Sequence, residues 1–100
     1  MGVVPRLRFE YPLVAENHVR LVEALLTRAD AARVAGAIVL DLGAVSEIDT
    51  TCVAELLRFK RRVGETVSVR ILDAAPTVRT LFRLTGVAWC FDFRTTNATS

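Results

Sequence analysis

The sequence predicts a single α/β domain in which a parallel or mixed sheet of about four strands packs against helices. Strand-like segments, in which apolar and polar residues alternate, are separated by segments whose apolar residues recur at helical spacing. The two kinds of segment take turns along the chain, which favours helical crossovers between strands. A length of 100 residues fits one domain.

The first strand and the first helix follow from local patterns. The stretch RLRFEY alternates strictly between charged and apolar residues, which predicts a half-buried strand over Arg6–Tyr11. Pro12 ends this strand, because proline cannot donate a hydrogen bond to a neighbouring strand. A helical pattern follows, with Asn17 as its expected N-cap and Gly36 as its expected stop.

The middle of the chain predicts a buried strand followed by a helix. The run AIVLDL, Ala37–Leu42, is apolar except for Asp41, which is typical of a strand covered on both faces of a sheet. Gly43 then turns the chain. From Val53 onward apolar residues occupy one face of a helix, which ends at Gly64.

The last third of the chain repeats the alternation. Val67–Leu72 reads as a strand, and Pro76 suits the first turn of the helix that ends at Gly86. The stretch VAWCFDF predicts a last strand over Val87–Phe93. The polar residues 94–100 are expected to fray.

We expect one domain over residues 1–100, with its core within about residues 6–93. The apolar faces of the predicted elements supply the side chains that should be buried. They are Val39, Leu42, Val53, Leu57, Val69, Ile71, Leu81 and Phe82.

Composition excludes several classes of protein. The net charge of +2, from 13 basic and 11 acidic residues, is too balanced to indicate binding to nucleic acid or an anionic membrane. No run reaches the roughly 18 apolar residues of a membrane span, so no membrane insertion is expected. The N-terminus lacks the apolar core of a signal peptide, and Cys52 and Cys90 form no disulfide framework. We therefore expect a cytoplasmic protein with unpaired cysteines.

The residues that enzymes and metal sites need are scarce. The sequence has no glycine-rich phosphate loop, and one histidine with two cysteines gives no metal-ligand spacing, so we expect no cofactor and no metal. His18 is expected to face solvent, across a strand from the threonines discussed below. The basic run Phe59–Arg62 fits the C-terminal half of a helix, where cations suit the helix dipole. The chain is therefore expected not to be an enzyme.

One polar cluster stands out, in the stretch SEIDTTCVAELL. Asp49, Thr50 and Thr51 all suit the N-cap of the helix that follows, so capping alone could account for one of them. They also follow a predicted buried strand, at the sheet edge where α/β proteins usually place their function. We expect Thr51 to be the capping or more inward threonine and Thr50 to point outward, where the helix dipole would favour a phosphate.

The run IVLDLGAVSEIDTTCVAELL resembles the core of a STAS domain, a family named for sulfate transporters and anti-sigma factor antagonists. The family pattern is a buried strand, an aspartate, two hydroxyl residues, a glycine and a large apolar residue. The matching positions here are Asp49, Thr50, Thr51, Cys52 and Val53. The later stretches VSVRIL and PTVRTLFRLTGV are similar to the strand and helix that follow in the family.

The resemblance implies a function. In the family the first hydroxyl residue after the aspartate is phosphorylated, which here is Thr50. It implies a bacterial anti-sigma factor antagonist, bound through Asp49, Thr50, Thr51 and Cys52 to an anti-sigma factor that is also a serine/threonine kinase. The unphosphorylated form would bind this partner and free the sigma factor.

Two alternatives remain within the family: an accessory subunit that binds the ATPase of a phospholipid-transporting ABC complex, and a stressosome-type scaffold module. The chain also departs from the family pattern. Cys52 replaces the glycine and could hinder close approach of a partner. The first strand and the final helix of the family are shortened or missing, so bare sheet edges could favour a homodimer.

Overall fold

The computed structural model describes residues 2–96 and contains one sheet of four parallel strands in the order β1-β2-β3-β4. The strands are β1 (Arg6–Arg8), β2 (Ala37–Asp41), β3 (Ser68–Leu72) and β4 (Asp92–Arg94). The α-helices are α1 (His18–Leu26), α2 (Ala29–Ala35), α3 (Thr50–Val63) and α4 (Pro76–Leu84), and the 3-10 helices are η1 (Ala15–Asn17) and η2 (Ala88–Cys90). The predicted α/β class is confirmed, and the sheet is wholly parallel.

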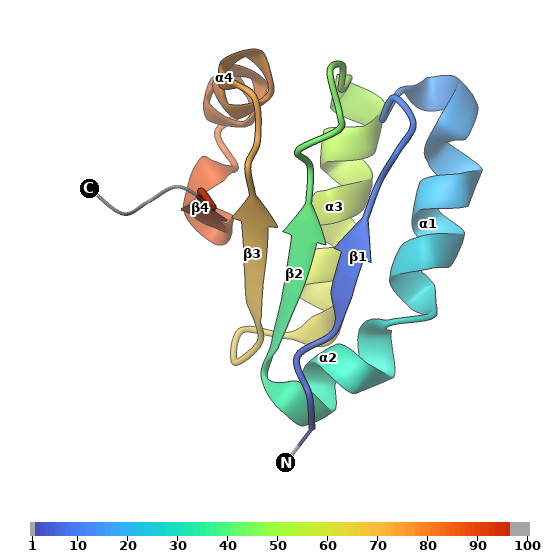
Figure 1. Ribbon diagram of the computed structural model, residues 1–100, viewed down its shortest axis with the longest axis vertical. Coiled ribbons are helices and arrows are strands. Elements are labelled where there is room, and N and C mark those ends of the chain that lie inside the picture. The colour runs from blue at the N-terminus through green and yellow to red at the C-terminus, as the bar shows by residue number, and fades with distance from the viewer. Residues whose placement is uncertain (1, 97–100) are drawn as a thin grey trace.

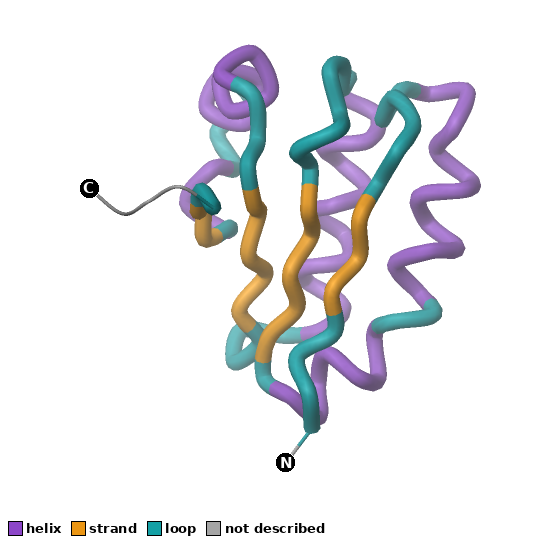
Figure 2. Tube along the Cα trace, viewed as in Figure 1, coloured by secondary structure: helices purple, strands orange, loops and turns teal. Residues whose placement is uncertain are grey.

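The helices are distributed unevenly over the sheet. In Figure 1, α1, α2 and α3 lie on the far side of the sheet, and α4 lies beyond the end of β3. Figure 2 shows each helix joining two neighbouring strands. The carboxyl ends of β1, β2 and β3 therefore meet at one edge, where the connecting loops gather.

The segment between β1 and β2 is less regular than predicted. The β1 ladder ends at Arg8, although the Phe9 N–H still donates to the Asp41 carbonyl at 3.3 Å. The single predicted helix is two helices, separated by Thr27 and Arg28. Gly36 ends α2 as predicted, with φ of 78°, in a left-handed conformation that glycine adopts without strain.

The prediction of a strand over all of Val87–Phe93 is wrong in its first part. Residues 88–90 form η2, and only the end of the predicted segment enters β4. This turn lets the rings of Phe91 and Phe93 each meet the Phe82 ring edge-on, with centroids 5.3 Å apart. The Thr96 N–H donates to the Asp73 carboxylate at 2.7 Å, so the predicted tail is anchored there, while residues 97–100 lie outside the described part.

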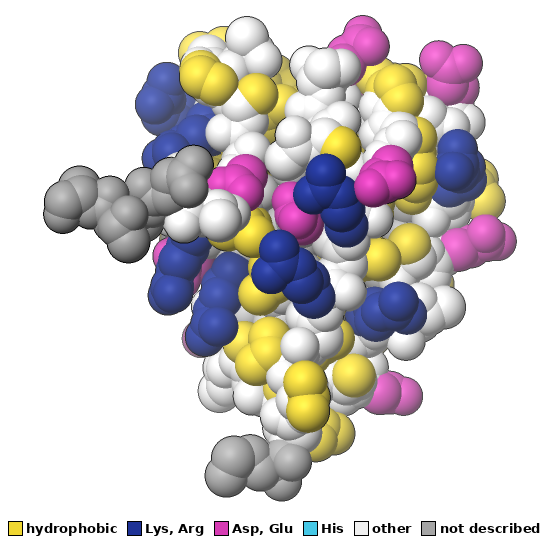
Figure 3. Space-filling model, viewed as in Figure 1, with side chains coloured by type: hydrophobic (Ala, Val, Ile, Leu, Met, Phe, Trp, Pro, Cys, Tyr) yellow, Lys and Arg dark blue, Asp and Glu magenta, His cyan; other side chains and the backbone are white. Residues whose placement is uncertain are grey.

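The prediction that Ala37–Leu42 is covered on both faces is confirmed, since only Val39 is partly exposed, but the two faces are covered in different ways. Val39 and Asp41 point away from the helices and lie beside Arg6 and Arg8 of β1 in the parallel register. Within residues 2–96, charged side chains rather than a helix overlie this face, as Figure 3 shows. Long arginine stems shield apolar sheet atoms while their guanidinium groups stay in water.

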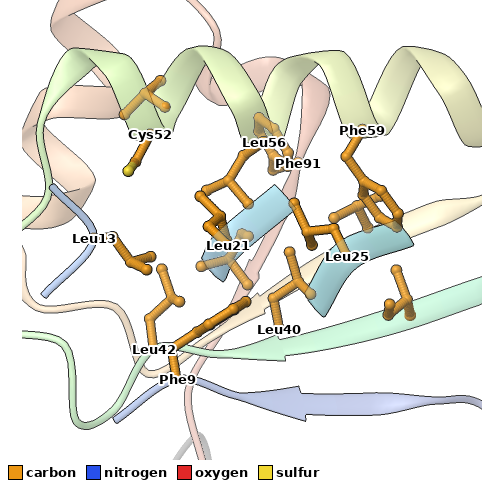
Figure 4. Close-up of a cluster of buried hydrophobic side chains, with 14 of the residues drawn as sticks. Phe9, Leu13, Leu21, Leu25, Leu40, Leu42, Cys52, Leu56, Phe59 and Phe91 are labelled. Carbon is orange, nitrogen blue, oxygen red and sulfur yellow. The ribbon is translucent and has the colours of Figure 1, made fainter. Parts of the chain in front are cut away.

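A single apolar cluster fills the space between the sheet and the helices (Figure 4). The predicted core residues that are buried are Leu42, Val53, Val69, Ile71 and Phe82. Val39, Leu57 and Leu81 are only partly buried. Helix α3 instead directs Leu56 and Phe59 inward, so Leu57 lies on the flank of the helix.

Candidate functional site at the start of helix α3

The start of α3 is positioned by contacts between two loops at the sheet edge. The Leu13 N–H donates to the Glu47 carbonyl, and the Asp49 N–H donates to the Leu13 carbonyl, both at 3.0 Å. Leu13 and Ile48 form an isolated parallel bridge. The loop after β1 and the loop after β2 therefore run together beyond their strands, and bring η1 against the start of α3.

The Asp49 carboxylate joins these two segments. Its Oδ1 accepts from the Cys52 N–H at 3.1 Å, which makes Asp49 the N-cap of α3. Its Oδ2 accepts from the Ala15 N–H at 2.7 Å, at the first residue of η1. One side chain therefore satisfies backbone donors at the starts of two helices.

The two threonines occupy the first two positions of α3, and both are exposed. Thr51 is predicted to be the capping or more inward threonine. The capping part of this prediction is wrong, because Asp49 takes that role with a carboxylate that can accept two hydrogen bonds, and both threonines are exposed. Thr50 points outward as predicted. Among the described residues, neither threonine hydroxyl has a hydrogen-bond partner, so both remain available to solvent.

Cys52 lies beneath this surface. Its side chain is fully buried, and burial, with smaller contributions from Asp49 and Glu55, raises the pKa of its thiol to about 11. The thiol is therefore neutral at physiological pH and packs as a small apolar group. Because it faces the core, it adds no bulk to the surface around Thr50. Cys52 and Cys90 are both free thiols.

A second carboxylate, Asp41, lies at the start of the loop that joins β2 to α3 and holds that part of the loop in place. Its Oδ2 accepts from Arg8 at 2.9 Å and from Arg6 at 3.2 Å, and its Oδ1 accepts from the Gly43 N–H at 2.9 Å. Burial by itself raises the pKa of Asp41, but the Gly43 N–H and the Arg8 and Arg6 guanidinium groups outweigh burial and bring it below the ordinary value. Asp41 is thus a structural anion rather than a proton donor.

Comparison with known proteins identifies the family of this chain and a solved structure of similar fold. A family model described as "Mlab, STAS domain" matches residues 2–89. The chain belongs to the STAS family. Its structure is similar to that of the phosphorylated form of the Bacillus cell fate determinant SpoIIAA, with a TM-score of 0.64 and 18% sequence identity, over 91% of this chain and 82% of that chain. At this identity the likeness shows the fold alone. No curated protein sequence matches the chain.

The predicted resemblance is therefore confirmed at the level of the family. STAS domains are generally binding modules without catalytic activity. Within residues 2–96, no cluster of three or more histidine, cysteine or acidic side chains is placed to hold a metal ion. In the same part of the chain, no helix is both long and apolar enough to cross a membrane.

One part of this STAS site, the η1 turn, was not predicted from the sequence. Helix α1 packs directly against α3, and Ala15 of η1 is tied to Asp49, so His18 does not lie across a strand from the threonines. His18 Nδ1 lies 3.0 Å from the Ala15 carbonyl oxygen, within the same turn. No local sequence pattern signals this arrangement, because it depends on the bridge between Leu13 and Ile48, which are far apart in the sequence.

Proposed function

We propose that this STAS domain is an anti-sigma factor antagonist whose binding to its partner is controlled by phosphorylation of Thr50. The observation that carries the proposal is the contrast between Thr50 and Asp49 at the start of α3. Thr50 is exposed, while the neighbouring Asp49 is fully engaged by two backbone N–H groups. The Thr50 hydroxyl is therefore open to receive a phosphoryl group from ATP through a partner kinase, as the Thr51 hydroxyl also is, and the family resemblance selects Thr50.

Two further observations support this choice of residue. Thr50 is the first hydroxyl residue after the aspartate, the position at which, as the family resemblance implies, a partner kinase phosphorylates STAS proteins of the antagonist type. A protein of similar fold, SpoIIAA, has a phosphorylated form. The proposed partner surface comprises the exposed Thr50 and Thr51, with Asp49 and the backbone of Cys52 behind them.

The energies favour a change in binding over a change in fold. A phosphate adds about −1.5 to −2 charges. At the N-terminus of a helix the dipole stabilises a negative charge by about 0.3–1 kcal/mol. At an interface, an unpaired charge that must be desolvated costs about 2–5 kcal/mol. Phosphorylation should therefore release the partner and leave the domain folded.

The first test compares Thr50→Glu and Thr50→Ala with the wild type. Thr50→Glu should weaken partner binding, since it places a negative charge in the interface. Thr50→Ala should bind but no longer respond to ATP and the kinase. Partner affinity and thermal melting are measured together, and mass spectrometry locates the phosphate.

The matched control is Thr66→Glu, an exposed threonine beyond the other end of α3. It should leave partner affinity unchanged. If Thr50→Glu also binds as the wild type does, Thr50 is not the switch. If Thr50→Glu unfolds the domain, the residue is structural.

A second candidate function is supported by the description of the matching family model, Mlab. In that case the same surface holds the ATPase subunit of a phospholipid-transporting ABC complex, and Thr50 needs no phosphorylation. The two functions differ in the protein that co-purifies with the tagged chain from its native cell. A kinase that modifies Thr50 favours the antagonist, whereas an ATPase with its permease, bound to an unmodified chain, favours the transporter subunit.

A further inference from the structure

Trp89 exposes a large apolar ring to solvent, which is unfavourable for an aromatic side chain. It is the only tryptophan of the chain, and 83% of its surface is open to solvent. Leu84, on the preceding helix α4, is also largely exposed. A large aromatic side chain left in water beside a groove is a feature of surfaces that another molecule covers.

Trp89 borders a groove between η2 and the C-terminal half of α3. The groove has a volume of about 620 Å³. Its lining includes Leu57, Lys60, Arg61 and Glu65 on one side and Trp89 and Cys90 on the other. Leu57, which the sequence pattern assigns to the core, is partly buried here and offers apolar surface within the groove.

The lining of this groove carries two cations, Lys60 and Arg61, against one anion, Glu65, so its net charge is positive and suits an acidic partner. Lys60 is committed to the fold, since its Nζ donates to the Gly64 and Val67 carbonyls at 3.3 Å and 2.6 Å. Arg61 is exposed on the rim, in a last helical turn that carries three basic residues. An arginine beside an exposed tryptophan is the pair of residue types that most often dominates binding energy at protein interfaces.

We propose that this groove is a docking site for a protein segment that places an apolar side chain against Trp89 and Leu57 and a carboxylate against Arg61. A second copy of the chain fits less well, because it would bring the same basic turn against itself. The groove lies at the opposite end of α3 from Thr50. The inference therefore goes beyond the proposed switch and does not depend on phosphorylation.

The test uses the whole chain in its native cell, with the photo-crosslinking residue benzoylphenylalanine in place of Trp89. The control places the same residue at Val34, which is also largely exposed but lies on α2. Irradiation should link position 89, and not position 34, to another protein. Mass spectrometry should find Asp or Glu beside the apolar side chains of the linked segment.

A matched pair of charge reversals tests the role of Arg61. Arg61 borders the Trp89 groove, whereas the adjacent Arg62 borders a different groove, between α1 and α3. Arg61→Glu should lower the yield of the cross-link about tenfold, as expected for loss of a charge-assisted hydrogen bond. Arg62→Glu should leave the yield unchanged.

Several results overturn the proposal. These are a cross-link to a second copy, a cross-link to lipid, no cross-link above that at Val34, or equal effects of the two charge reversals. A synthetic peptide of the linked segment should also quench or shift the fluorescence of Trp89 in the wild-type chain, and an unchanged spectrum counts against docking at this residue. Repeating the cross-link with Thr50→Glu separates the two proposals, since an independent docking site predicts an unchanged yield, whereas the phosphorylation switch predicts weaker binding of the partner at the start of α3.

Discussion

The two ends of helix α3 are closed in different ways. At its N-terminus, the Asp49 carboxylate bonds to Cys52 within the helix and to Ala15, a residue far earlier in the chain. At its C-terminus, Gly64 turns the chain with φ of 100°, and Lys60 donates to two carbonyls within seven residues of itself. The side chain that closes the first end therefore reaches a distant segment, whereas the side chain that closes the second end bonds locally. The second end has one long-range bond as well, from Arg33 of α2 to the Arg62 carbonyl at 3.2 Å.

This difference matches what each end offers a partner. A residue modified by a kinase must be presented in a defined place, and the tie between α3 and η1 gives Thr50 such a place. The local closure at the other end leaves the flank of α3 uncovered, so Leu57 and Trp89 line an open groove. The N-terminal end is thus the more closely defined of the two, and the C-terminal end the more open.

The largest loss of stability should come from shortening a buried side chain at the middle of α3. Leu56 is fully buried at the middle of α3, so Leu56→Ala should lower the free energy of unfolding by about 2–5 kcal/mol. Leu57→Ala, on the partly buried flank, should lower it by only about 1 kcal/mol. Urea denaturation of both variants measures the difference, and equal losses would contradict the observed orientation of the helix.

A smaller effect is expected from breaking the C-terminal end alone. Gly64 has φ of 100° and ψ of 168°, a conformation essentially limited to glycine, so Gly64→Asn should destabilise the domain by about 1–3 kcal/mol. Gly36 at the end of α2 has φ of 78° and ψ of 8°, which asparagine tolerates. Gly36→Asn should therefore cost clearly less. If the two variants melt together, conformation does not explain the choice of glycine at Gly64.

These two ends also show what a sequence can reveal. Gly36 and Gly64 were predictable as stops because the conformation they adopt depends on the residue itself. The hydrogen bond from the Ala15 N–H to Asp49 was not predictable, because it depends on the Leu13–Ile48 bridge, which holds the two segments side by side. Long-range pairing of this kind leaves no local pattern.

The covering of the sheet and the start of the last strand also depend on long-range contacts that leave no local pattern. The run Ala37–Leu42 is buried on both faces as predicted, but a sequence does not show that Arg6 and Arg8, rather than a helix, lie over Asp41. The stretch Val87–Phe93 has the composition of a strand. Residues 88–90 nevertheless form η2, and Phe91 and Phe93 after this turn pack against Phe82. The role of Thr50 stays a prediction that only the binding experiment can test.

Breaking the N-terminal end alone should have a more moderate effect. Asp49→Ala removes both acceptors and should cost about 1–2 kcal/mol, the usual range for loss of an N-cap. Asp49→Asn keeps one acceptor oxygen, so it can still cap α3 but cannot also serve Ala15. It should lose roughly half as much stability. Equal losses in thermal or chemical denaturation would mean that the charge of Asp49, and not its two hydrogen bonds, holds this end.

The finest comparison uses the two cysteines, since one lies at each end of α3. Cys52 is buried beneath the N-terminal turn with a pKa of about 11, whereas Cys90 lines the groove at the other end. At pH 8, a thiol with that pKa is ionised in only about one molecule in a thousand, and only the thiolate reacts with iodoacetamide. Native protein should therefore be modified at Cys90 long before Cys52.

Asp49→Ala should change this order at one end only. Loosening the first turn of α3 by 1–2 kcal/mol should speed modification of Cys52 by about 5–30-fold, because the thiol reacts through local opening of that turn. The rate at Cys90 should stay constant, since no contact of Asp49 reaches the groove. Peptide mapping by mass spectrometry gives both rates from one sample. A parallel rise at both cysteines would show that α3 opens as a single unit, and that its two ends are not independent.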